Sequence, residues 1–190
     1  MVPALFLDRD GVINENRADY VRRWEDVVFI PQALIGLQAV SHLPVKIVIV
    51  TNQSAVGQGL LTLTEAERLN EKIVATVRQQ GGRIDAVFMC PHTPQQACTC
   101  RKPLPGLLQQ AAQALTLDLS ISIMVGDALS DIQAGRAAGV QSTALVLTGR
   151  GQQQVQLPAA AALHPFPIFP TLAEALYELT RTILPTNKKI

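Results

Sequence analysis

Two carboxylates, Asp8 and Asp10, stand two positions apart at the end of an apolar run and are followed directly by Gly11. In open parallel sheets, ligands gather at the carboxyl ends of the strands. Both acids would then lie at the mouth of a crevice, where they could bind a ligand or a cation. The glycine permits the sharp turn that must follow. Taken alone, the same pattern also suits a strand that ends in a solvated turn.

A calcium-binding loop would explain the acid pair in another way. Such a loop needs further oxygen ligands at alternate positions and a glutamate at the twelfth. Counted from Asp8, the chain offers Val12, Asn14 and Asn16, and Asp19 stands at the twelfth position. The calcium interpretation therefore fails.

Three further polar clusters lie at or near the ends of predicted strands. They are Thr51-Asn52-Gln53-Ser54, Cys100-Arg101-Lys102-Pro103 and Gly126-Asp127 with Asp131. Each alone has a plain structural explanation: a polar turn, a solvated basic turn, and an acid that caps the first turn of a helix. Four clusters in this order, counted with the acid pair, are not expected by chance, so we interpret them as one site.

The cysteines predict a metal site. Cys90 and His92 form one pair, Cys98 and Cys100 form a second, and one residue separates the members of each pair. A Cys₃His set meets the tetrahedral, soft-ligand demand of structural zinc, and no position is left for the water that a catalytic zinc keeps. Three cysteines so close together fit a disulfide framework poorly. The alternative is three free thiols and a surface histidine in a proline-rich loop.

Short apolar runs alternate with amphipathic segments, a pattern that favours an α/β fold with a parallel sheet. The predicted strands are 4–7, 45–50, 85–89, 120–125 and 143–147. The predicted helices are 31–42, 105–115, 130–138, 171–184 and one that a capping box opens at Thr64 and Gly81-Gly82 ends. Residues 150–170 hold three consecutive glutamines, four consecutive alanines and four prolines, and they predict a surface connection to the last helix.

The composition sets limits on the class of protein. The chain has 190 residues, 48% of them apolar, which suits one domain over 1–190 with a sizeable core. The net charge of +1 gives no argument for nucleic acid or an anionic membrane surface as a partner. No apolar run approaches the roughly 18 residues of a membrane span, and no secretory signal is seen, so we expect a cytoplasmic protein.

The order of the four clusters resembles that of the haloacid-dehalogenase superfamily of aspartate-nucleophile phosphatases, over about residues 4–150. The resemblance implies a Rossmann-like, three-layer α/β fold with a central parallel sheet. It also implies that Asp8 attacks phosphorus and that Asp10 acts as general acid and then general base. By the same resemblance, Lys102 and Thr51 stabilise the transferring phosphoryl oxygens.

Two carboxylates beside a phosphate dianion need a compensating cation. At about 4 Å and an effective dielectric constant near 20, each pair of unit charges repels by about 4 kcal/mol. Mg²⁺ suits the oxygen ligands. The resemblance implies as ligands the Asp8 carboxylate, the Asp10 backbone carbonyl and Asp127, with Asp131 orienting that shell.

The gaps between the clusters are too short for a separate cap domain. With the cysteine loop, they make the chain similar to the zinc-bearing, capless branch, whose phosphatases act on heptose bisphosphates and on histidinol phosphate. The resemblance implies a phosphorylated sugar as substrate, with histidinol phosphate or another small phosphomonoester as the alternative, and we expect a monomer. It implies these substrate-binding residues: Asn16, Arg17, Tyr20, Asn52, Gln53, Ser54 and Arg101.

The chain departs from this branch where a cation is often found. Ala128 follows Asp127, where the branch often has lysine, and the turn 55–59 carries no basic residue. These losses remove cations that would help to bind a second phosphate but leave the chemistry intact. A zinc-stabilised interaction module without activity is the remaining alternative, against which Asp8, Asp10, Lys102 and Asp127 all argue.

Overall fold

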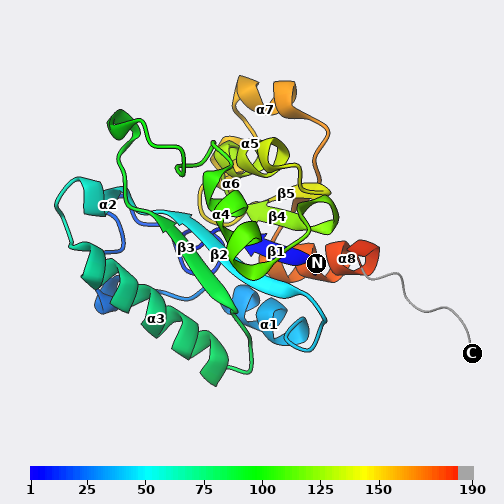
Figure 1. The fold of residues 1–190 in the computed structure, drawn as a ribbon, viewed down its shortest axis with the longest axis horizontal. Helices are drawn as coiled ribbons and strands as arrows, with labels where there is room; N and C mark the ends of the chain where they lie inside the picture. Colours follow the sequence, from blue (N-terminus) through cyan, green and yellow to red (C-terminus); the bar gives the residue numbers. More distant parts are fainter. Residues whose placement is uncertain (184–190) are drawn as a thin grey trace, which may run out of the picture.

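The computed structural model describes residues 1–183, and its centre is a sheet of six strands in the order β3-β2-β1-β4-β5-β6 (Figure 1). Every neighbouring pair of these strands is parallel. The strands are β1 (Ala4–Leu7), β2 (Lys46–Asn52), β3 (Ala86–Cys90), β4 (Ile123–Gly126), β5 (Ser142–Val146) and β6 (Ile168–Phe169). The expected parallel α/β fold is confirmed.

Helices cover both faces of the sheet and complete three layers. They are α1 (Pro31–Ala39), α2 (Ser54–Gly57), α3 (Leu63–Gln79), α4 (Gly106–Leu115), α5 (Leu129–Ala138), α6 (Gly151–Gln154), α7 (Pro158–Leu163) and α8 (Leu172–Ile183). Of these, α2 and α3 are the helices between β2 and β3, and α1 is the α-helix between β1 and β2. Neither connection inserts a separate cap domain, as the sequence predicts.

The core divides into two parts because successive side chains of a strand point to opposite faces. Leu5 and Leu7 of β1 pack with α1, α3 and α8 on one face. Ala4 and Phe6 pack with α4 and α5 on the other. All four side chains are buried, which is why the strand is apolar throughout instead of alternating.

The strand order reverses beside β1. From β1 the chain goes to β2 and β3 on one side, then crosses to the other side of β1 as β4. In open parallel sheets a ligand crevice forms outside the carboxyl ends of the strands at such a switch point. Asp8 follows β1 directly and Asp127 follows β4 directly, so the switch point brings the first and last polar clusters together.

Two predicted elements differ from the structure near β4 and α1. The chain over 120–125 is a strand only from Ile123, because the Asp118 side chain accepts a hydrogen bond from the backbone N–H of Ser120 at 3.0 Å and holds Leu119–Ile121 as a 3-10 turn. The helix predicted over 31–42 ends earlier, at Ala39. For the last helix, the predicted end at 184 lies outside the described residues.

Residues 150–170 are more than the surface connection that we expected from the sequence. They contain α6, α7 and the edge strand β6, whose two residues pair with Leu145 and Val146 of β5. Ala160 of the alanine run and Phe166 are buried against Leu129 and Ile132 of α5. The tract is therefore anchored by few side chains, which explains its weak sequence pattern.

The N-cap of helix α3 lies two residues before the predicted cap. Thr62, and not Thr64, is the N-cap: its Oγ1 accepts from the Glu65 N–H at 3.2 Å, and Glu65 Oε2 accepts from the Thr62 N–H at 2.6 Å. Glu65 can reach only the residue three positions before it, so it selects Thr62. The predicted buried face is confirmed at Ala66, Leu69, Ile73 and Val77.

Membrane insertion finds no support in the helices of residues 1–183. None of them combines the length with the apolar character that a bilayer crossing requires.

The reciprocal cap of α3 gives a stability prediction. Replacing Thr62 with alanine removes the two hydrogen bonds of its hydroxyl, one from the Glu65 N–H and one to Glu65 Oε2, and we expect the free energy of unfolding to fall by about 1 kcal/mol. Thr64→Ala, at the exposed second residue of the helix, should change it by less than about 0.5 kcal/mol. Urea denaturation of both variants measures the difference, and an equal loss for the two threonines would contradict the assignment of the cap.

Candidate active site

The chain that follows β1 stays close to β4 and to Asp127 as it turns. The backbone N–H of Asp8 still donates to the Val125 carbonyl at 3.0 Å, so β1 and β4 remain paired up to the nucleophile candidate. Gly11 then has φ of +88°, a left-handed conformation that glycine adopts without strain. A Cβ at this position would also collide with the Asp127 carboxylate, so the turn needs glycine for two reasons.

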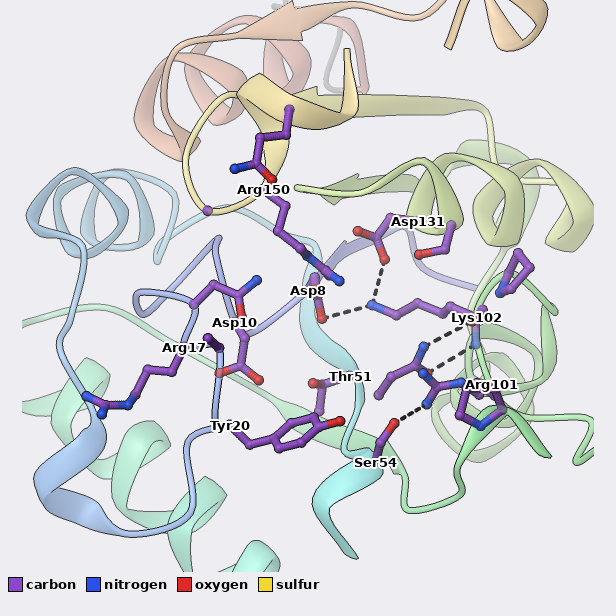
Figure 2. A pocket seen from close by; sticks show the side chains of 18 residues that line it. Asp8, Asp10, Arg17, Tyr20, Thr51, Ser54, Arg101, Lys102, Asp131 and Arg150 are labelled. Atoms are coloured by element: carbon purple, nitrogen blue, oxygen red, sulfur yellow. Dashed lines mark hydrogen bonds and ion pairs between the residues drawn. The ribbon is translucent and has the colours of Figure 1, made fainter. Parts of the chain in front are cut away.

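Lys102 connects the two sides of the switch point. Its Nζ lies 2.8 Å from Asp8 Oδ1 and 2.7 Å from Asp131 Oδ1, and it donates to the Val50 carbonyl at 2.8 Å (Figure 2). Burial alone would lower the pKa of Lys102, but the carboxylates of Asp131 and Asp8 outweigh it and raise that pKa to about 12. Lys102 therefore stays charged at neutral pH.

Asp8 is held in a balance of opposing effects. Burial, helped by the neighbouring Asp131 and Asp127 carboxylates, raises the pKa of Asp8 to about 7, although the Lys102 ammonium works in the opposite direction. Burial also raises the pKa of Asp127, with Asp131 adding to the shift. Three acids confined together in this way need more positive charge than one lysine supplies.

The three acids could hold a metal ion. Carboxylate oxygens of Asp8, Asp127 and Asp131 all lie within 4.8 Å of one another. Such a set of hard oxygen donors fits Mg²⁺. Gly149, like Gly11, places bare backbone against the Asp127 carboxylate, where a Cβ would occupy the space beside it. The residues present therefore fit a divalent cation.

Asp10 is held by donors to which the sequence analysis gave no such role. Arg9 is 1% exposed, and its Nη2 lies 2.8 Å from Asp10 Oδ2. Asn14 Nδ2 and Gln53 Nε2 each donate to Asp10 at 2.8 Å. Although burial would raise the pKa of Asp10, the Arg9 guanidinium and these hydrogen bonds hold it below its usual range. Asn70 of α3 in turn accepts from Arg9 Nη1 at 2.8 Å.

The cluster at the end of β2, which begins inside the strand with Thr51 and Asn52, has two tasks. Thr51 Oγ1 accepts from Gln53 Nε2 at 2.9 Å, which leaves the threonine hydroxyl proton free to donate elsewhere. Asn52 holds the backbone of Lys102 at two points: its Nδ2 donates to the carbonyl at 3.0 Å, and its Oδ1 accepts from the N–H at 3.1 Å. β2 therefore fixes the lysine loop directly.

These groups border a cavity of about 820 Å³. Among the residues predicted to bind substrate, those that line it are Asn16, Arg17, Tyr20, Asn52, Ser54 and Arg101. Gln53 does not line it, because its side chain is buried beneath the cavity against Asp10 and Thr51. Arg17 and Arg101 lie on opposite sides of the opening (Figure 2).

Two functional candidates were missed in the sequence. Arg9 stands inside the first cluster, and a cation between two acids is a signal that could have marked it. Arg150 lies just after β5, lines the cavity and pairs with Asp127, its Nη2 3.3 Å from Oδ1. Its position at the start of the predicted surface connection hid it.

The predicted zinc ligands converge. The three sulfur atoms of Cys90, Cys98 and Cys100 lie 3.1–3.5 Å apart, and His92 Nδ1 lies 3.6 Å from the first and 3.4 Å from the last. In tetrahedral zinc sites the Zn–S bond is about 2.3 Å long and the Zn–N bond about 2.0 Å. These lengths place two sulfur ligands about 3.8 Å apart, and a sulfur and a nitrogen ligand about 3.5 Å apart. A small expansion of the cluster would therefore fit the ion, and the Cys and His donors suit zinc.

The cysteine loop is attached to the cavity through Arg101. Its Nη1 donates to the His92 carbonyl at 3.0 Å and to Ser54 Oγ at 2.7 Å. In Figure 1 the loop between β3 and α4 stands out from the edge of the sheet. Its two ends carry the ligand pairs, and Pro94 between them also lines the cavity.

A carboxylate nucleophile candidate and a buried lysine at the switch point of a parallel sheet define the class: the chain is a phosphatase of the haloacid-dehalogenase type. The family model described as HAD-hydrolase-like matches residues 99–175. The chain belongs to the family of the D-glycero-beta-D-manno-heptose-1,7-bisphosphate 7-phosphatases, as the following relatives show.

The family member from Pseudomonas aeruginosa is 34% identical over 174 residues, which are 92% of this chain and 97% of that protein. The member from Escherichia coli K12 is 38% identical over 156 residues, 78% of this chain and 81% of that protein. The crystal structure of the D,D-heptose 1,7-bisphosphate phosphatase from B. bronchiseptica, complexed with magnesium and phosphate, superposes with a TM-score of 0.85 at 32% identity, over 95% of this chain and 99% of that one.

The cysteine loop gives a prediction about metal content. Protein purified under reducing conditions should carry about one zinc ion per chain, because four suitable ligand atoms already converge. Cys98→Ser should lose the metal and lower the melting temperature, since structural zinc contributes to folding. Thr99→Ser, a matched change between two ligands, should retain both. Metal analysis by mass spectrometry measures the content, and wild-type protein without stoichiometric zinc would refute the site.

Proposed function

We propose that this phosphatase removes the 7-phosphate of D-glycero-D-manno-heptose 1,7-bisphosphate through an aspartyl-phosphate on Asp8. The observation that carries the chemistry is the pairing of Lys102 Nζ with Asp8 and Asp131 at the edge of an open cavity. The substrate comes from the names of the relatives and from the arginines around that cavity.

Magnesium is the proposed catalytic cation. The Asp8 carboxylate, the Asp10 backbone carbonyl and Asp127 would hold it, and Asp131 would stay beside that shell through its pairing with Lys102. When bound, the ion would offset the repulsion between these acids and the substrate phosphate and would stabilise negative charge on the phosphoryl oxygens. The neighbour from B. bronchiseptica was solved with magnesium and phosphate, which supports this choice.

In the first step, the Asp8 carboxylate attacks phosphorus and the bond from phosphorus to the sugar oxygen breaks. Asp10 delivers a proton to that oxygen. Its donors hold Asp10 ionised before substrate binds, so the proton must be gained when the phosphate arrives, because added negative charge raises the pKa of a nearby carboxyl. In the second step, a water attacks the aspartyl-phosphate, Asp10 takes its proton, and inorganic phosphate leaves with Asp8 restored.

Lys102 and Thr51 would stabilise the charge that develops on the transferring group. Lys102 is fixed by three contacts, and Thr51 keeps its hydroxyl proton free. Donors that are already oriented need no reorganisation during reaction, and this is the largest catalytic term in phosphoryl transfer.

The cavity itself favours a substrate with two phosphate groups. Arg17, Arg101 and Arg150 line it, and they place three guanidinium groups along its wall. A second phosphate would be attracted there, whereas the ammonium group of histidinol phosphate would be repelled. The cavity wall also offers neutral polar groups that could bind the hydroxyl groups of a sugar. They belong to Asn16, Tyr20, Asn52 and Ser54.

Zinc would have a structural task in this scheme. It would fix the backbone of His92, whose carbonyl holds Arg101 in the cavity wall. Three thiols without a disulfide suit a reducing compartment, which supports the proposed cytoplasmic location. We propose that residues 1–190 form one domain, as the length of the chain suggests. We also propose that nucleic acid and membranes are not its partners, because the net charge is only +1. We further propose that the chain acts as a monomer.

The nucleophile can be tested by replacing the Asp8 carboxylate with a neutral amide. We expect Asp8→Asn to lower kcat by a factor of about 1,000 or more, because an amide does not form the phosphoenzyme. The melting temperature should not fall, since burial already disfavours the Asp8 charge. Glu71→Gln, on the exposed face of α3, should keep full activity. Phosphate release and thermal melting give both readings, and near wild-type hydrolysis by Asp8→Asn would disprove the assignment.

The substrate can be tested with a panel of esters and Mg²⁺. We expect kcat/KM for heptose 1,7-bisphosphate to exceed that for heptose 7-phosphate, histidinol phosphate and simple phosphomonoesters by about tenfold or more. Equal rates across the panel would remove the heptose assignment and leave a general phosphatase. If the protein hydrolysed none of these esters, a zinc-stabilised module without activity would become the better explanation.

A further inference from the structure

Arg150 reaches from the loop after β5 toward the acids of the site (Figure 2). Its Nη2 lies 3.3 Å from Asp127 Oδ1, and its Nε lies 3.4 Å from Oδ2. Its backbone N–H donates to Oδ2 at 2.8 Å. The Asp127 side chain is fully buried, whereas that of Arg150 is 52% exposed. The guanidinium can therefore leave Asp127 for the cavity while the backbone contact stays.

Two cations compete for the Asp127 carboxylate: the Arg150 guanidinium and a divalent metal ion. Asp127 is fully buried, so its charge needs a partner, and the Arg150 guanidinium provides one. Asp127 also belongs to the triad of acids that fits a divalent cation. Because Mg²⁺ carries two positive charges, its binding would repel the guanidinium and take over the carboxylate.

The other cations that line the cavity are more firmly engaged or lie farther toward solvent. Lys102 contacts two carboxylates and the Val50 carbonyl. Arg101 is held by Ser54 and the His92 carbonyl. Arg17 is exposed and pairs with Asp19 on its own loop. Mg²⁺ would also claim Asp8 from Lys102, but Lys102 keeps Asp131 and the Val50 carbonyl. Within the described cavity wall, Arg150 is thus the cation that would lose its paired carboxylate to the metal.

We propose that Arg150 is a metal-released anion-binding residue: it is the counter-ion of Asp127 until Mg²⁺ binds, and it then binds the remote phosphate of the substrate. This inference rests on the proposed bisphosphate substrate. A guanidinium binds phosphate with two parallel hydrogen bonds, which a lysine does not reproduce. Ser130 and Gln153 line the same cavity and offer further polar groups.

The counter-ion role is tested by metal binding without substrate. Titration calorimetry with Mg²⁺ should give a dissociation constant for Arg150→Gln that is about threefold or more below the wild-type value, because the competing charge is gone. Arg68→Gln, which removes the same charge from the exposed face of α3, should bind Mg²⁺ as wild type does. Equal or weaker binding by Arg150→Gln would overturn this role.

The anion-binding role is tested by comparing two substrates. Arg150→Gln should raise KM for heptose 1,7-bisphosphate by about tenfold or more, with kcat and the KM for heptose 7-phosphate changed by less than about threefold. The KM of Arg150→Lys for the bisphosphate should lie between the values for wild type and Arg150→Gln, because lysine keeps the charge but lacks the planar guanidinium fork. Arg68→Gln should leave both constants unchanged.

The outcomes separate this inference from the proposed function. If wild-type protein prefers the bisphosphate and Arg150→Gln keeps that preference, the inference alone is wrong. If wild-type protein shows no preference for the bisphosphate, the proposed substrate is wrong and the anion-binding role falls with it. A parallel loss of kcat on both substrates would assign Arg150 to the chemical step and would equally overturn the inference.

Discussion

The buried ammonium group of Lys102 is the interaction on which the rest of the site depends. Its three partners come from β1, from β2 and from α5, so one charge ties together both sides of the switch point. A buried charge without partners is very costly, and so is each of the acids around it. The lysine and the acids therefore offset one another's charge, and the lysine backbone is itself fixed at two points by Asn52.

Much of this architecture can be predicted from the sequence, for a geometric reason. Parallel strands end at the same edge of a sheet, so polar residues that follow apolar runs must meet there, whatever the connections do. Asp8, Thr51 and Asp127 were placed in this way, and the cysteine loop was predicted from ligand type and spacing alone. The structure brings all of these candidates together where expected, although their catalytic roles stay proposals.

The remaining features depend on where side chains point, which spacing does not encode. Asp10 follows the nucleophile candidate closely, yet its oxygens meet Arg9, and Gln53 turns beneath the cavity instead of lining it. The pairing of Arg150 with Asp127 joins residues 23 positions apart through a tertiary fold. The same limit applies to α6, α7 and β6, because a tract that buries few side chains leaves little periodicity to detect.

The way the cysteine loop is attached has an evolutionary consequence. Its ligand pairs fix the two ends of the loop, at β3 and immediately before Arg101, while the chain between them lies at the rim of the cavity and against Gly57 of α2. Insertions or deletions in the intervening stretch would leave Lys102 where it is. Descendants of such an enzyme could therefore lengthen this arm and recognise new molecules with it, while the reaction centre is inherited unchanged.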